Sequence, residues 1–79
     1  MNIEGIDFKS EGPTLVGRHY CSFFLRVWKE KGLWIVSVAR RKQVVIVTKP
    51  QRTRKGAVAV AKEAVTDLLV EEEIRAGAV

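Results

Sequence analysis

Basic side chains are prominent among the residues of this sequence that could do chemistry. Between Lys31 and Lys62 there is no Asp or Glu, and most of the cationic residues there form two groups on either side of an apolar run. The groups are Arg40, Arg41 and Lys42, then Lys49, Arg52, Arg54 and Lys55. Charge of one sign concentrated in this way is typical of a surface that meets a polyanion. The positive charge behind the net +5 is therefore concentrated in one part of the chain rather than spread evenly over it.

Catalytic and metal-binding chemistry has little support in the sequence. General acid–base catalysis needs titratable groups that converge in a cleft, whereas the acids here lie before residue 31 or along the C-terminal segment. His19 is the only histidine and Cys21 the only cysteine, so neither type can supply a pair of metal ligands. No P-loop pattern is present. We therefore expect no enzyme activity, no metal and no cofactor.

The hydrophobic pattern places the basic residues on an α+β domain. Residues 1–17 predict a short strand and a loop, since Gly12, Pro13 and Gly17 interrupt any longer element. Residues 18–49 alternate as antiparallel strands, with a hairpin loop at Lys29 to Gly32. The expected fold is one small domain, an antiparallel three- or four-stranded meander with one C-terminal helix packed on one face.

The helix is expected over residues 53–75, with a frayed tail at 76–79. Apolar residues recur there at helical spacing, at Val58, Ala61, Val65, Leu68 and Leu69. Thr53 can cap the helix, but Gly56 lacks the carboxylate that would complete a capping box.

The charges on this helix oppose its dipole. Arg52, Arg54 and Lys55 lie at its positive N-terminal end, and acids occupy residues 71–73 near its negative end. Free N–H groups beside three cations make the helix start a candidate phosphate site. Basic turns also blunt sheet edges and keep small proteins soluble, so a solubility role stays open.

An aromatic face is the second candidate surface. With a four-residue hairpin loop, Phe23, Leu25 and Val27 face the core and the opposite face carries Tyr20, Phe24 and Trp28. Two interpretations stay open. Neighbours of the first strand, the 10–17 loop or a second copy of the chain could pack on this face, or bases could stack on its rings.

The order of strands followed by a helix resembles the latter part of double-stranded RNA-binding domains. The resemblance rests on "EGP" ahead of "FFLRV", and on "TRKGAVAVAKEAVTDLL". In that family a Ser-Lys-Lys-x-Ala run opens the last helix, and its lysines contact phosphates. Thr53, Arg54, Lys55 and Ala57 match it, which implies a phosphate role for Arg54 and Lys55. The family's first helix has no counterpart.

A second resemblance covers a similar share of the chain. The segments "EKGLWIVSV" and "AKEAVTDLLVEEE" are similar to small antitoxins of the HicB type. Those proteins sequester a ribonuclease toxin, so this resemblance implies a protein partner.

The predicted function is non-catalytic binding of RNA or DNA through the phosphate backbone. The basic residues named above would supply the contacts, and binding would be largely independent of sequence and strongly dependent on salt. The alternative is a protein-interaction module, such as a homodimer or an antitoxin-like inhibitor, that uses the aromatic face. No small-molecule substrate is indicated. A cytoplasmic location without membrane contact is expected, since no apolar run approaches the roughly 20 residues that span a bilayer and the N-terminus lacks signal-peptide features.

Overall fold

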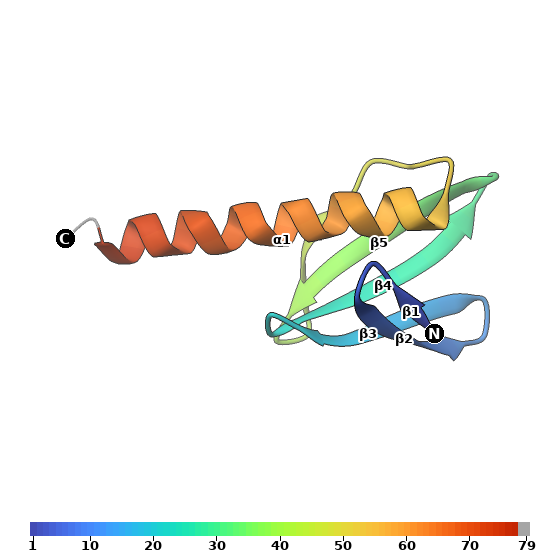
Figure 1. Ribbon diagram of the computed structural model, residues 1–79, viewed down its shortest axis with the longest axis horizontal. Coiled ribbons are helices and arrows are strands. Elements are labelled where there is room, and N and C mark those ends of the chain that lie inside the picture. The colour runs from blue at the N-terminus through green and yellow to red at the C-terminus, as the bar shows by residue number, and fades with distance from the viewer. Residues whose placement is uncertain (78–79) are drawn as a thin grey trace.

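Six antiparallel strands and one helix make up the chain (Figure 1). A computed structural model describes residues 1–77, without the side chains of residues 18 and 19. The strands are β1 (Asn2–Ile3), β2 (Ile6–Glu11), β3 (Thr14–Tyr20), β4 (Phe23–Glu30), β5 (Leu33–Arg40) and β6 (Gln43–Val47), and the helix is α1 (Arg54–Gly77). The strands lie in the sheet in the order of the sequence. The α+β class, the antiparallel meander and the C-terminal helix are confirmed.

The expected three or four strands are too few, in part because the chain turns at Cys21 and Ser22, where no glycine indicates a turn. Residues 18–28 were expected to form one strand, but Cys21 and Ser22 divide them into β3 and β4. Both turn residues have positive φ, 52° and 71°. Two-residue hairpin turns of this geometry usually carry Asn or Gly, so the sequence has no signal for this one.

The expected 10–17 loop is also wrong, since its residues belong to β2 and β3. Only Gly12 and Pro13 form the turn between these strands, and Gly12 has a φ of 63°. Gly17 is buried within β3 opposite Phe8, where a Cβ atom would lie 2.7 Å from Cε1 of the Phe8 ring. The glycine therefore makes room for a core ring instead of breaking the strand.

The core face of the sheet is the expected one, although the register differs. The hairpin turn consists of Lys31 and Gly32 alone, so Glu30 opposes Leu33 and the strands are shifted by two residues from the expected pairing. A shift of two preserves the faces because side chains alternate along a strand. The residues of these two strands that were expected to face the core are Phe23, Leu25, Val27, Trp34, Val36 and Val38. All are fully buried beneath the helix except Trp34, which is half-buried against the core.

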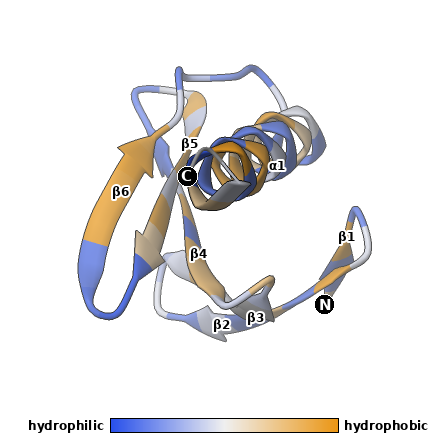
Figure 2. Ribbon diagram, turned by 90° about the vertical axis from the view of Figure 1, so that its left-hand side faces the viewer, coloured by the Kyte–Doolittle hydropathy of each residue, from blue (hydrophilic) through white to orange (hydrophobic). Residues whose placement is uncertain are grey.

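The helix packs on β4 and β5 through small residues, and the opposite face of the sheet is left open (Figure 2). Ala57, Val58, Ala61 and Val65 are fully buried on its inner side. The helix continues to Gly77, past the expected end at residue 75, and residues 70–77 are all exposed. Figure 1 shows this last part projecting beyond the sheet. The rest of the expected frayed tail, residues 78–79, lies outside the described residues.

The connection from β6 to the helix is held against β5. The Val36 N–H donates to Oγ1 of Thr48 (3.1 Å), while the Thr48 N–H donates to the Val36 carbonyl (2.9 Å). Trp34 and Gln51 then exchange both of their backbone hydrogen bonds, at 2.8 and 2.9 Å. Pro50 lies between these contacts, where its missing N–H is not needed. These bonds bring the start of the helix next to the β4–β5 turn.

Candidate nucleic-acid interface

The predicted basic residues occur at two ends of the sheet. Arg41 and Lys42 form the β5–β6 turn, whereas the β6–α1 connection and the helix start carry Lys49, Arg52, Arg54 and Lys55. The β4–β5 turn lies beside the helix start (Figure 1). β5 separates the two ends with eight residues, which span about 25 Å.

At the first end, the turn exposes two cations. Arg41 and Lys42 have positive φ, 52° and 67°, and their side chains are exposed. Within the described residues neither makes an ion pair. Both are therefore available to a polyanion.

Arg40, also predicted as a binding residue, is engaged inside the chain. Its guanidinium makes two bonds to the Glu72 carboxylate and lies 4.3 Å from the centroid of the Phe23 ring. This side chain points to the helix side of the sheet, where it ties β5 to α1. A phosphate would have to displace Glu72 to reach it.

The Arg40–Glu72 pair predicts a pH-dependent contribution to stability. The hydrogen bond from Arg40 holds the pKa of the Glu72 carboxyl below its usual range. Because the folded-state pKa is the lower one, the pair stabilises the fold above the ordinary glutamate pKa of about 4.3 and loses this effect as pH falls through the folded-state pKa. We expect Glu72→Gln to lower the urea midpoint at neutral pH but not in acid below that pKa. An equal deficit at both pH values would contradict this.

At the second end, two cations flank the Trp34 ring. Lys29 Nζ lies 5.6 Å from the ring centroid and Arg54 Cζ lies 5.9 Å from it. Lys29 is opposite Trp34 in the β4–β5 register, and Arg54 is the first residue of the helix. The sequence analysis missed this contact because it placed Lys29 in a four-residue loop. With a two-residue turn, the pairing of β4 and β5 puts Lys29 opposite Trp34, and the contact would have been predicted.

The helix start is capped as expected, but it also carries an acid from elsewhere in the chain. The Gly56 N–H donates to Oγ1 of Thr53 at 3.0 Å, which confirms the predicted N-cap. Glu4, in the β1–β2 turn, lies 3.7 Å from Nζ of Lys55. This carboxylate supplies the negative charge that helix N-termini favour and that the sequence of the helix lacks.

A hollow of about 420 Å³ at the helix start is lined by Asn2, Ile3, Glu4, Arg54 and Lys55. The Glu4 carboxylate in this hollow would repel a phosphate, so the helix start alone is a poor phosphate pocket. The Lys55 side chain is 81% exposed, however, and an exposed ion pair is weak and screened by salt. Lys55 can therefore exchange Glu4 for a phosphate at the surface.

The open face carries two of the three predicted aromatic residues. Phe24 and Trp28 lie on it, with Phe24 39% exposed and Trp28 half-buried. Tyr20 does not, since an irregularity between Gly17 and Tyr20 shifts the β3 register. Tyr20 packs against the core instead, with Lys62 Nζ 6.0 Å from its ring centroid. The expected grouping of the three rings on one face is therefore wrong for Tyr20.

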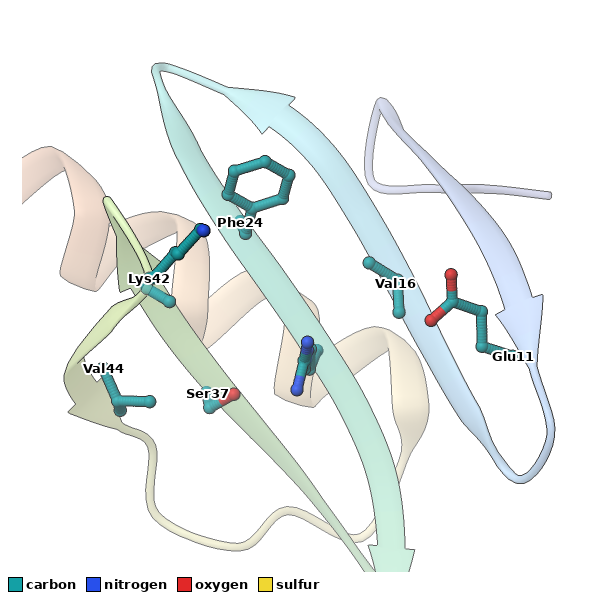
Figure 3. Close-up of a pocket in the computed structure, with 8 residues that line it drawn as sticks. Glu11, Val16, Phe24, Ser37, Lys42 and Val44 are labelled. Carbon is teal, nitrogen blue, oxygen red and sulfur yellow. The ribbon is translucent and has the colours of Figure 1, made fainter.

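The open face is hollowed along β5 (Figure 3). Ser37 and Ala39 on β5 are smaller than the residues on the flanking strands, Phe24 and Arg26 on β4 and Val44 on β6. All five residues line a hollow of about 530 Å³. One of the alternatives for what covers this face, the 10–17 segment, is wrong, since that segment belongs to β2 and β3 of the same sheet.

Comparison with protein-family models, with curated proteins and with solved structures finds no match to this chain. The two resemblances seen in the sequence therefore stay predictions. Among residues 1–77 no helix has the length of apolar sequence needed to cross a bilayer. The described residues also include no group of three or more His, Cys, Asp or Glu side chains placed to hold a metal ion. The function must therefore be inferred from the surfaces themselves.

Proposed function

We propose that this chain binds nucleic acid through its phosphate backbone, using cations at both ends of the sheet. The supporting observation is that most of the predicted cations have no acidic partner in the described part of the chain. Of the seven predicted cations, two form ion pairs within the described residues, Arg40 with Glu72 and Lys55 with Glu4. The other five predicted cations have no acidic partner among residues 1–77: Arg41, Lys42, Lys49, Arg52 and Arg54. Unpaired cations repel one another, and a polyanion relieves this repulsion.

The same contacts explain why binding should be insensitive to sequence. Lysine and arginine at turns and at a helix start reach phosphate oxygens, which carry no sequence information. Each phosphate neutralised releases counterions, so affinity should fall steeply as salt rises. The proposed mode of binding therefore places the protein anywhere along a nucleic acid rather than at a particular sequence.

Charge reversal at one end of the helix tests the proposal. Arg54→Glu should weaken binding of labelled oligonucleotides in fluorescence anisotropy and flatten the salt dependence by about one unit of slope. An acid at this position suits the helix dipole, but it loses the Trp34 contact and adds a second carboxylate to the hollow that holds Glu4. Thermal unfolding therefore checks that the variant is folded before its affinity is compared with that of wild type. Arg75→Glu is the matched control, because it changes the net charge equally at the other end of the same helix.

Equal affinity loss in the two variants would show that net charge alone is responsible. No binding of wild-type protein to any oligonucleotide at low salt would refute the proposal.

The second candidate, protein interaction, would then be favoured. Its supporting observation is the edge strand β6, where Val44, Val45 and Val47 are all about half exposed. Exposed apolar edge strands pair readily with strands of another chain.

A further inference from the structure

The hollow along β5 is one continuous groove on the open face of the sheet. A second hollow of about 470 Å³ overlaps the first and extends it past Trp28 and Val47. Both are lined by Val16, Arg26, Ser37 and Val44. The small floor residue Ser37 is flanked by longer side chains on β4 and β6, so the groove follows the direction of β5. The backbone contacts proposed above leave this groove unexplained.

One wall of the groove presents a ring, a cation and a second ring in a row. Phe24, Arg26 and Trp28 alternate along β4 and so project on the same side. Successive members stand about 6.6 Å apart, twice the rise per residue of a strand. Arg26 is exposed, and within the described residues its side chain makes no hydrogen bond or ion pair. Unpaired bases stack on such rings, and a guanidinium between the rings suits the intervening phosphate.

The groove also joins the two basic ends of the sheet. Lys42, in the β5–β6 turn, lines the groove beyond Phe24. At the other end, Trp28 directly precedes Lys29, and Val47 comes two residues before Lys49. Glu11 is the only acid among the lining residues, and Figure 3 places it on β2, across the groove from Lys42 and Val44. The cations beside the groove therefore lie along β4 to β6, where a polyanion is favoured.

We infer that the groove binds a single-stranded nucleic acid, with bases stacked on Phe24 and Trp28 and a phosphate at Arg26. The inference rests on the proposed function and adds the class of ligand to it. A duplex would not suit this wall, because its bases are stacked on one another and present only their edges. The groove accounts for cations at both ends, since one strand laid along it reaches both.

The test compares three probes of equal length in fluorescence anisotropy. They are a labelled oligothymidylate of about 16 nucleotides, an abasic oligomer with the same sugars and phosphates, and a blunt duplex. Phe24→Leu with Trp28→Leu removes the rings but keeps apolar side chains. Phe24→Tyr with Trp28→Phe is the matched control that keeps both rings. Both pairs of changes lie on the sheet surface, and thermal unfolding checks that each variant is folded.

Wild-type protein should bind the oligothymidylate more tightly than the abasic oligomer. The ringless variant should lose this preference, by about 5-fold or more for each ring, while its affinity for the abasic oligomer stays unchanged. The ring-preserving control should behave as wild type. In a Trp34→Phe background Trp28 is the only tryptophan, and its fluorescence should be quenched by oligothymidylate but not by the abasic oligomer.

Other outcomes overturn the inference in distinguishable ways. If the ringless variant binds oligothymidylate as wild type does, the groove is not the site although the proposed function stands. If wild-type protein binds none of the probes, the proposed function and the inference both fail. If sedimentation shows a wild-type dimer that the ringless variant cannot form, the groove is an interface between two copies of the chain.

Discussion

Replacing Arg41 with Asn and Lys42 with Gly is expected to weaken nucleic-acid binding while it raises thermal stability. The two residues hold positive φ angles, 52° and 67°, in a two-residue hairpin turn. Asn–Gly is the preferred sequence for such turns. Replacing a residue that is strained at positive φ with one that accepts this conformation raises the free energy of unfolding by about 1 kcal/mol. The same change removes two cations that have no acidic partner in the part of the chain that the structure describes. Affinity at low salt should fall by about 10-fold or more, and unfolding should occur at a higher temperature.

Opposite signs for binding and stability make this result hard to explain by misfolding. The chain provides a matched control in the β3–β4 turn, where Cys21 and Ser22 have similar angles of 52° and 71°. Cys21→Asn with Ser22→Gly should raise stability by a similar amount and leave binding unchanged. If the first double variant bound as tightly as wild type, the β5–β6 turn would not contact the ligand. Its charges would then serve solubility or protect the sheet edge.

Gly17→Ala is expected to destabilise the fold, against the usual direction of such a change. Where the backbone permits it, Gly→Ala stabilises a protein by about 0.4–1 kcal/mol. Here the new Cβ would lie 2.7 Å from the Phe8 ring, which is 2% exposed in the core, so the ring or the backbone would have to shift. Overpacking of this kind costs about 1–3 kcal/mol. A domain of this size should then unfold roughly 4–20 °C lower in a thermal melt.

A double variant separates this steric effect from others. Phe8→Leu removes the ring and should itself destabilise the core, but Gly17→Ala should cost much less in its presence. The coupling free energy between the two positions should be about 0.5 kcal/mol or more, as for residues in contact. Additive effects would contradict the close approach of Gly17 to the ring.

Much of the architecture could be predicted because local chemistry and burial agree. Thr53 caps the helix as its side chain and position indicate, and the change of period near Pro50 marks the end of the strands. The core face was predicted correctly despite the wrong register, since an even shift keeps Leu25 and Val27 on the same side. Alternation along a strand is thus more robust than the assignment of strand partners.

The remaining features depend on contacts between segments, which the pattern of one segment cannot report. Tyr20 faces the core because the register of β3 shifts before it. Trp34 becomes part of a basic cluster because Lys29 opposes it and Arg54 begins the helix nearby. Glu4 reaches the helix start from a turn some fifty residues away in sequence. These contacts decide which of the predicted cations are unpaired.

The order of the strands has a consequence for how the protein folds. Every strand pairs with the next one along the chain, and the strands from β1 to β6 are joined by tight turns. Each hairpin can close with little loss of loop entropy, and low contact order of this kind is associated with fast folding. The sheet can therefore assemble hairpin by hairpin during synthesis. The helix, which is translated after all six strands, then docks on a sheet that is already in register.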